Sequence, residues 1–251
     1  MPVADLTQVQ IQTAATKGWS VESVPLDGWI LRAAGGYSQR ANSVLAAGPL
    51  ERDLQDAIAA AEDWYAKRDL QPCFQVFEGV HPVELLEALV SRGYQEVEGY
   101  DLPAQVFVAA NPEAVADPDV QLAPHPPEDW ASEWLQMCGD PVSYSRLVND
   151  ILVASPAASK AFATLMVDEE PAAVAYGAIT DGMLGVFCVD TDPAFRRRGL
   201  ARRVIGSLHS WGKEHRADGA YLQMWRDNSA ARPLYEGMGY TLLDDYTYFR
   251  R

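Results

Sequence analysis

The chain has 251 residues and a formal net charge of −15, from 20 Lys and Arg against 35 Asp and Glu. Hydrophobic residues make up 48% and charged residues 22% of the sequence, a globular composition that excludes a disordered or collagen-like chain. Because the net negative charge repels polyanions, we expect no nucleic acid partner, whereas a cationic substrate would be attracted.

The three cysteines are Cys73, Cys138 and Cys188. Their odd number and wide spacing fit neither a disulfide framework nor a zinc site, so we expect a reducing, cytoplasmic location and no metal. The first fifteen residues lack the basic and apolar regions of a signal peptide. The longest apolar stretch, Pro171 to Val189, is broken by Asp181-Gly182. We therefore expect no membrane segment.

Periodicity in the first half predicts strands and helices in alternation. Gly93 follows the second helix as a C′ glycine would. The predicted strands are Gly28–Arg32, Arg40–Ala46, Cys73–Phe77 and Tyr100–Val108, and the predicted helices are Asp53–Arg68 and Val83–Ser91.

Five prolines lie between Asn111 and Glu128. Proline disfavours helix interiors and central strands, so this stretch predicts a boundary, with a linker at about Ala109–Pro118. We therefore expect two domains, residues 1–115 (the first half) and 116–251 (the second half). Asp119–Ala123 is compatible with an edge strand that opens the second half.

The second half begins with two predicted helices and continues as a three-stranded meander. Asp181-Gly182, flanked by apolar runs, is a strong hairpin signal. The predicted helices are Glu128–Cys138, Ser143–Val153, Leu200–His215 and Ser229–Met238, and the predicted strands are Ala161–Val167, Ala172–Ile179, Met183–Val189, Ala220–Trp225 and Tyr240–Phe249.

A faint internal repeat relates the two halves. Leu89–Tyr94 aligns with Tyr235–Tyr240 at an offset of 146, and in both copies a glycine precedes the final tyrosine. Each copy follows a long helix and a short strand, so the order of elements favours a duplicated architecture.

The segment after Val186 has the features of an anion site. A buried strand leads through Asp192-Pro193 into Arg196-x-x-Gly199-x-Ala201, which opens an amphipathic helix. A helix N-terminus presents free N–H groups and partial positive charge, and small residues let a phosphate approach the backbone. Five arginines lie within eight residues, although a glycine beside a solvated charge run is the alternative interpretation.

This segment resembles the acyl-CoA-binding motif of the GNAT superfamily of N-acetyltransferases, in which Arg196, Gly199 and Ala201 match the fixed positions. A second motif follows in the order typical of the family: Leu222–Trp225, then Asn228-x-x-Ala231, Leu234-Tyr235 and Gly239-Tyr240. The resemblance covers about residues 120–251. It implies an α+β fold with a mixed, mostly antiparallel sheet flanked by helices, in which two central strands splay apart. We expect one partial and one complete copy in tandem.

The resemblance also implies roles for single residues toward acetyl-CoA as co-substrate. Asn228 would contact the cofactor near the reacting end, and Tyr235 would donate a proton to the leaving sulfur. Backbone groups would hold the pantetheine arm and the pyrophosphate; the residues concerned are Phe187, Cys188 and Val189 for the arm and Arg196, Arg197, Arg198, Gly199, Leu200 and Ala201 for the pyrophosphate. The implied activity is transfer of an acetyl group to a small-molecule or peptidic primary amine.

Direct attack of the amine on the thioester requires no covalent enzyme intermediate, so we interpret Cys188 as a buried strand thiol. A backbone N–H near Val189 could stabilise the oxyanion. Asp190, at the strand end, is the candidate base, with a water chain as the alternative. We assign structural or surface roles to the other titratable groups nearby: Asp181, Asp192, His209 and His215.

The first half lacks the Arg-x-x-Gly-x-Ala loop, and acidic residues stand at the start of its helix. Leu89 and Pro82 occupy the positions of Tyr235 and Asn228. We therefore expect a degenerate GNAT-like domain without cofactor chemistry, which either packs against the second half or forms part of the acceptor pocket through Gly35–Tyr37 and Arg40–Ser43. Two other functions stay open: a non-catalytic acyl-CoA-binding regulator, and nucleic acid binding, which the charge disfavours. A monomer or a homodimer is expected.

Overall fold

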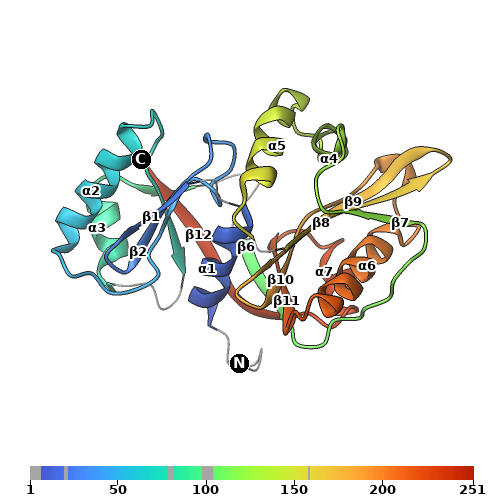
Figure 1. The fold of residues 1–251 in the computed structure, drawn as a ribbon. Coiled ribbons are helices and arrows are strands. Elements are labelled where there is room, and N and C mark those ends of the chain that lie inside the picture. The colour runs from blue at the N-terminus through green and yellow to red at the C-terminus, as the bar shows by residue number, and fades with distance from the viewer. Residues whose placement is uncertain (1–6, 20–21, 78–81, 98–103, 158) are drawn as a thin grey trace.

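A computed structural model describes residues 7–19, 22–77, 82–97, 104–157 and 159–251. One sheet runs through the whole molecule, with helices on both of its faces (Figure 1). The first half contributes α1 (Gln8–Trp19), β1 (Glu22–Leu26), β2 (Trp29–Ala33), β3 (Val44–Leu45), α2 (Leu54–Ala66), β4 (Cys73–Phe77), α3 (Leu85–Ser91), β5 (Gln95–Glu96) and β6 (Ala104–Ala109).

The second half contributes the remaining elements. Its strands are β7 (Val120–Ala123), β8 (Ser159–Val167), β9 (Glu170–Thr180), β10 (Met183–Thr191), β11 (Gly219–Trp225) and β12 (Thr241–Arg250). Its helices are α4 (Trp130–Cys138), α5 (Ser145–Ala154), α6 (Leu200–Glu214) and α7 (Arg232–Glu236), with short 3₁₀ turns at Val142–Tyr144 and Pro193–Phe195.

The strand order is β1-β2-β3-β4-β12-β6-β11-β10-β9-β8-β7. Most neighbours are antiparallel, and the two parallel pairs among the described strands are β3–β4 and β10–β11. The predicted mixed, mostly antiparallel α+β sheet is therefore confirmed.

The last strands of the two halves change places in this sheet. β6 of the first half lies between β11 and β12, and β12 of the second half lies between β4 and β6. In Figure 1, β12 runs from the second half across the middle of the molecule to the C-terminus beside α2, where Arg251 lies 3.5 Å from Glu62. The two halves thus share one continuous set of backbone hydrogen bonds.

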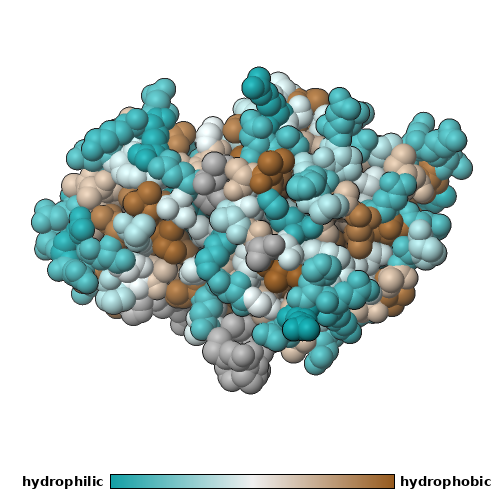
Figure 2. Space-filling view, in the orientation of Figure 1, coloured by the Kyte–Doolittle hydropathy of each residue, from teal (hydrophilic) through white to brown (hydrophobic). Residues whose placement is uncertain are grey.

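Alternate residues of β9 and β10 separate two cores. Tyr176 and Phe187 pack with α1, α4 and α5 on one face, whereas Val186 packs with α6 and α7 on the other. A third core lies beneath α2 and α3 in the first half. On the face shown in Figure 2, apolar residues form separate patches among hydrophilic ones. Among the described helices, none has the length and apolarity needed to cross a membrane.

The prediction of a strand over Arg40–Ala46 was wrong for most of that range, because only Val44–Leu45 pair as β3. The preceding residues form a loop held by the side chain of Asn42. Its Oδ1 accepts hydrogen bonds from the N–H groups of Ala34 and Gly36, and its Nδ2 donates to the carbonyl of Ser38. These bonds replace a strand ladder.

Other differences from the predicted elements are smaller. α1 and β1 were not predicted, since α1 is only weakly amphipathic and Pro25 lies within β1. Pro25 is tolerated there because β1 is an edge strand. The helix expected over Ser229–Met238 is shorter, as α7, whereas the strand expected over Tyr240–Phe249 is present as β12. Part of the strand expected over Tyr100–Val108 lies outside the described residues.

Candidate active site

β10 and β11 diverge at the centre of the sheet. They pair in parallel through four residue pairs, which end at Val186–Leu222, although β10 continues to Thr191 and β11 to Trp225. Beyond that point β11 stays paired with β6, and β10 stays paired with β9. The facing edges of β10 and β11 therefore carry backbone N–H and C=O groups that no strand pairing between them uses.

A β-bulge lies where β10 leaves β11. The register with β9 shifts between Phe187 and Asp190, and Cys188 has a φ of 52°. A left-handed conformation is uncommon for a residue other than glycine, and bulges of this kind redirect backbone and side chains beside active sites. Burial raises the pKa of the Cys188 thiol well above its ordinary value. The raised pKa favours the protonated thiol at neutral pH, and the half-buried Cys188 lines the cavity described below.

The helix that follows β10 begins without a side-chain cap. Gly199 is the N-cap of α6 with a φ of 78°, and among the described residues no side chain caps the amides of the first turn. A Cβ at Gly199 would meet no atom of the described residues within 4 Å apart from its chain neighbours, so the space beside Gly199 is open. The buried face of α6, with Val204 and Leu208, fixes the helix against the sheet. Open amides at a helix N-terminus fit a diphosphate.

The five arginines of this segment divide into two groups. Arg196, Arg202 and Arg203 have defined partners on the protein, whereas Arg197 and Arg198 are exposed and have no hydrogen bond or ion pair within the described ranges. The Nε and Nη2 of Arg196 donate to the carbonyls of Thr191 and Met137, at 3.0 and 3.3 Å. The cations available to a phosphate here are therefore Arg197 and Arg198.

Arg202 and Arg203 hold the linker between the halves. Arg202 pairs with Glu113, and Arg203 bonds Asp117 through its Nε at 2.5 Å and Asp119 through its Nη2 at 2.6 Å. His209 belongs to the same contact: its Nδ1 lies 2.7 Å from the carbonyl of Glu113, and its Nε2 lies 2.7 Å from the hydroxyl of Tyr240.

Burial lowers the pKa of His209 to about 4, so the ring is neutral at pH 7. A neutral ring can donate from Nδ1 to the Glu113 carbonyl and accept the Tyr240 proton at Nε2. These bonds give His209 a structural role.

Of the two candidate catalytic groups, Asp190 lies on β10 and Tyr235 lies on α7. The charge of Asp190 acts on Tyr235, whose pKa is raised first by burial and then by that carboxylate. Among the described residues, none hydrogen-bonds the Tyr235 hydroxyl. Burial also raises the pKa of Asp190, although its Oδ1 accepts the N–H of Thr191 and lies 3.7 Å from Arg196. The phenol of Tyr235 is therefore protonated at neutral pH, and the pKa of the Asp190 carboxyl lies above its ordinary value.

Asn228 lies at the turn between β11 and α7. Its Oδ1 accepts the N–H of Ala231 at 3.1 Å, which shapes the start of the helix that carries Tyr235. The Nδ2 group has no partner within the described part of the chain and is free to donate. Asn228 therefore both orders this turn and presents a donor beside it.

A cavity of about 190 Å³ lies beside Phe187 and Cys188, on the face of the sheet opposite α6. Half of the residues around it are aromatic, and they come from both halves of the chain. The first half supplies Trp19 from α1, Tyr37, Ser38, Gln39 and Arg40 from the β2–β3 loop, and Ala104 from β6. The second half supplies Trp134, Cys138, Asp140, Phe187, Cys188, Trp225, Tyr246 and Tyr248.

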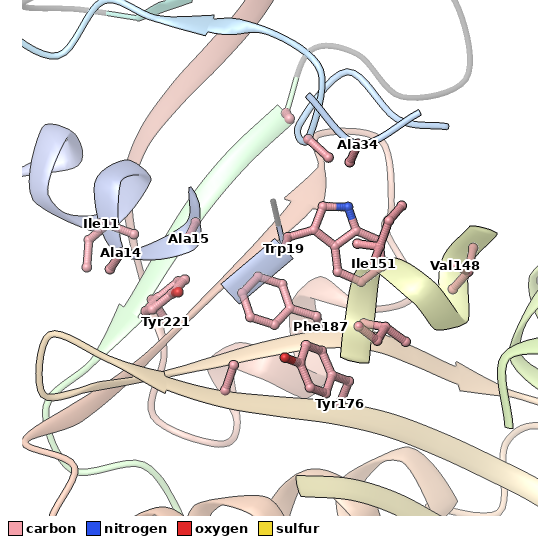
Figure 3. Packing of buried hydrophobic residues seen from close by; sticks show 14 of the residues in the cluster. Ile11, Ala14, Ala15, Trp19, Ala34, Val148, Ile151, Tyr176, Phe187 and Tyr221 are labelled. Carbon is pink, nitrogen blue, oxygen red and sulfur yellow. The ribbon is translucent and has the colours of Figure 1, made fainter. Parts of the chain in front are cut away.

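Contacts across this cavity tie the halves together. The Tyr37 hydroxyl donates to Oδ2 of Asp140 at 2.7 Å, and the Trp19 and Trp134 rings meet edge to face at 6.1 Å. Trp19 also stacks on Phe187 at 6.2 Å (Figure 3). Most of the lining was missed from sequence, because these residues are distant in the chain. The turn and polar residues of the β2–β3 loop were the one signal that pointed to it.

The comparisons with known proteins agree with this geometry. A family model described as "Probable histone acetyltransferase Rv0428c C-terminal" matches residues 8–249. The chain belongs to this family. The expected membership of the GNAT superfamily is confirmed, and the protein is a GNAT-type acetyltransferase.

Two curated relatives resemble the acetyltransferase over most of its length. An uncharacterized N-acetyltransferase of Bacillus subtilis strain 168, YobR, is 26% identical over 225 residues, 88% of each chain. A probable histone acetyltransferase of Mycobacterium tuberculosis H37Rv, Rv0428c, is 28% identical over 251 residues, 96% of this chain and 73% of that one.

Solved structures show the same fold. A GCN5-related N-acetyltransferase from Kribbella flavida superposes with a TM-score of 0.64 and 18% identity, over 96% of this chain and 94% of that one. A tandem GNAT protein from the clavulanic acid biosynthesis pathway superposes with a TM-score of 0.57 and 13% identity, over 78% of this chain and 69% of that one.

Proposed function

We propose that the protein transfers an acetyl group from acetyl-CoA to a primary amine by direct attack within a ternary complex. One observation carries the proposal. Where β10 is no longer paired with β11, its residues Phe187 and Cys188 line an aromatic cavity, and the chain then leads to the uncapped start of α6. A passage between the strands would let a thioester reach an acceptor in that cavity.

The residues around α6 would hold the diphosphate. The N–H groups from Arg197 to Ala201 would bind its oxygens, with the exposed guanidinium groups of Arg197 and Arg198 as counter-charges. The unpaired edge at Phe187, Cys188 and Val189 would bond the pantetheine amides, and Asn228 Nδ2 would donate near the reacting end. When bound, acetyl-CoA supplies the activated acetyl group.

Two side chains, Asp190 and Tyr235, would transfer the protons of the reaction. Asp190, or a water that it orients, would take a proton from the attacking nitrogen, since a carboxyl of raised pKa is a better base than an ordinary one. The N–H of Val189 would face the oxyanion. Tyr235 would protonate the sulfur as the carbon–sulfur bond breaks, and its raised pKa keeps the phenol protonated at neutral pH.

The first test separates this enzyme from a regulator that only binds acyl-CoA. Purified protein is incubated with acetyl-CoA and a panel of primary amines, and free thiol and acetylated amine are measured together. We expect one thiol for each acetylated amine. Binding of acetyl-CoA by calorimetry without amine-dependent thiol release across the panel would favour the regulator instead.

A further inference from the structure

The walls of the cavity beside Phe187 are suited to binding a flat apolar group. Trp19 and Trp134 meet at an interplanar angle of 82°, and Tyr37 and Trp134 at 75° with their centroids 6.4 Å apart. Edge-to-face pairs of this kind leave ring faces and edges that a further ring can extend. Phe187 and Trp225 add rings from the two divergent strands.

The cavity is large enough for one planar ring. An engineered apolar cavity of about 150 Å³ binds benzene. The cavity of about 190 Å³ beside Phe187 therefore has room for one six-membered ring with a short arm. Since Phe187 and Cys188 belong to the point where β10 leaves β11, a ring held by the aromatic walls would direct a short arm toward the acetyl group.

Two charged side chains line the cavity on different sides of the ring site. Arg40 lies beside Tyr246, to whose hydroxyl its Nη2 donates at 3.5 Å, whereas Asp140 lies beside Tyr37, and its Oδ2 accepts the Tyr37 hydroxyl. Its Oδ1 has no partner within the described segments, so it can attract an ammonium group. The formal charge of −15 also draws a cation toward the protein.

We propose that the acceptor is an arylalkylamine, a primary amine joined by a short arm to one planar aromatic ring that is held between the first-half and second-half walls of this cavity. The inference rests on the proposed function and names its acceptor. It makes Trp134 and Tyr37 specificity-determining residues. A lysine side chain or a polyamine offers no ring to these walls, so we expect such amines to be poorer ligands.

The test measures binding and turnover separately. Calorimetry on the CoA-saturated protein compares 2-phenylethylamine with 2-cyclohexylethylamine, which has the same number of heavy atoms but no aromatic face, and with Nα-acetyl-lysine amide. We expect 2-phenylethylamine to bind about tenfold more tightly than either of the others. Equal or tighter binding of the cyclohexyl compound or the lysine compound would overturn the inference.

A pair of variants tests the wall itself. Trp134→Ala should weaken 2-phenylethylamine binding about tenfold and leave acetyl-CoA binding unchanged. Trp211→Ala, which removes another partly buried tryptophan from a helix remote from the cavity, is the matched control and should change neither. Unchanged binding in Trp134→Ala, or an equal loss in both variants, would also overturn the inference.

Turnover with the same amines separates the two proposals. Tight binding of 2-phenylethylamine without acetylation would contradict the proposed function but support the ligand class. Acetylation of the lysine compound in preference to 2-phenylethylamine would support the function and contradict the arylalkylamine acceptor.

Discussion

The two halves of the chain differ at the start of equivalent helices, α2 in the first half and α6 in the second. At α6, Gly199 leaves the first amides open. At α2, the N-cap Asp53 accepts the N–H of Gln55, and Oδ2 of Asp27 accepts the N–H groups of Glu51 and Arg52. In the first half, carboxylates of the chain itself accept hydrogen bonds from amides at and before the helix start. In the second half, the amides at the start of α6 have no such side-chain partner among the described residues. The two helix starts of one sheet thus differ in whether a side chain of the protein caps them.

The difference extends to the catalytic position. Tyr235 of the second half corresponds to Leu89 of the first, which is fully buried in the core beneath α2 and α3. A leucine cannot donate a proton, whereas the Tyr235 hydroxyl has no competing partner among the described residues. The first half thus contributes residues to the wall of the cavity, while the candidate proton donor lies in the second half. The predictions below test this contrast.

The largest effect is expected from Tyr235→Phe, which removes the proton donor while keeping the ring. Loss of a general acid costs roughly 10²–10⁴-fold in kcat. Steady-state kinetics should show this loss with little change in the KM for acetyl-CoA. Tyr240→Phe is the matched control, because its hydroxyl bonds His209 rather than facing the strands. An unchanged kcat in Tyr235→Phe would remove Tyr235 from this role.

The pH dependence sharpens the assignment of Asp190. The base must be ionised to act. Because the pKa of Asp190 is raised, we expect kcat/KM to begin to fall, as the pH is lowered, at a higher pH than an ordinary carboxyl would give. Asp190→Asn should lower kcat/KM at neutral pH about 10²-fold and remove the decrease of kcat/KM at acid pH. The raised pKa of Tyr235 predicts no loss of the acid form up to about pH 10. A wild-type acid limb that persists in Asp190→Asn would assign the base elsewhere.

Closing the open helix start should weaken acetyl-CoA binding. Gly199→Asp places a carboxylate where the first half has Asp53, and Gly199→Asn adds the same bulk and the same left-handed strain without charge. We expect both variants to bind more weakly, with Asp about tenfold worse than Asn in Kd by calorimetry. Equal affinities for the two variants would show that charge at this position is unimportant.

The smallest effect is expected from Asp27→Asn in the first half. Hydrogen bonds to Arg52 and the loop amides lower the pKa of Asp27, so its contribution to stability is present above the ordinary carboxyl pKa and disappears as the pH falls below it. The variant should melt at a lower temperature than the wild type at pH 7, with a smaller difference near pH 3. It should still bind one acetyl-CoA, because Glu51 and Asp53 remain. A second bound acetyl-CoA would contradict the closed first half.

Local patterns made the second half predictable. The Asp181-Gly182 hairpin, the amphipathic helix after Gly199 and the alternation of its strands each depend on residues close in sequence, and the corresponding elements are present. The exchange of β6 and β12 was not predictable, since both segments have strand sequences that do not specify their neighbours. Which strands pair is decided by contacts between distant parts of the chain.

The same distinction applies to the site. The anion loop is one continuous stretch, so its motif could be recognised. The cavity depends on pairs such as Tyr37 and Asp140, which are 103 positions apart. The prediction of a strand over Arg40–Ala46 missed the side-chain bonds of Asn42 that fold this segment into a loop of the cavity wall.

A crystal structure with bound CoA tests the central claim most directly. We predict one CoA per chain, with its diphosphate on the amides from Arg197 to Ala201, its pantetheine between β10 and β11, and the helix start at α2 still occupied by Asp27. A diphosphate at α2, or a CoA that avoids the gap between β10 and β11, would contradict the account.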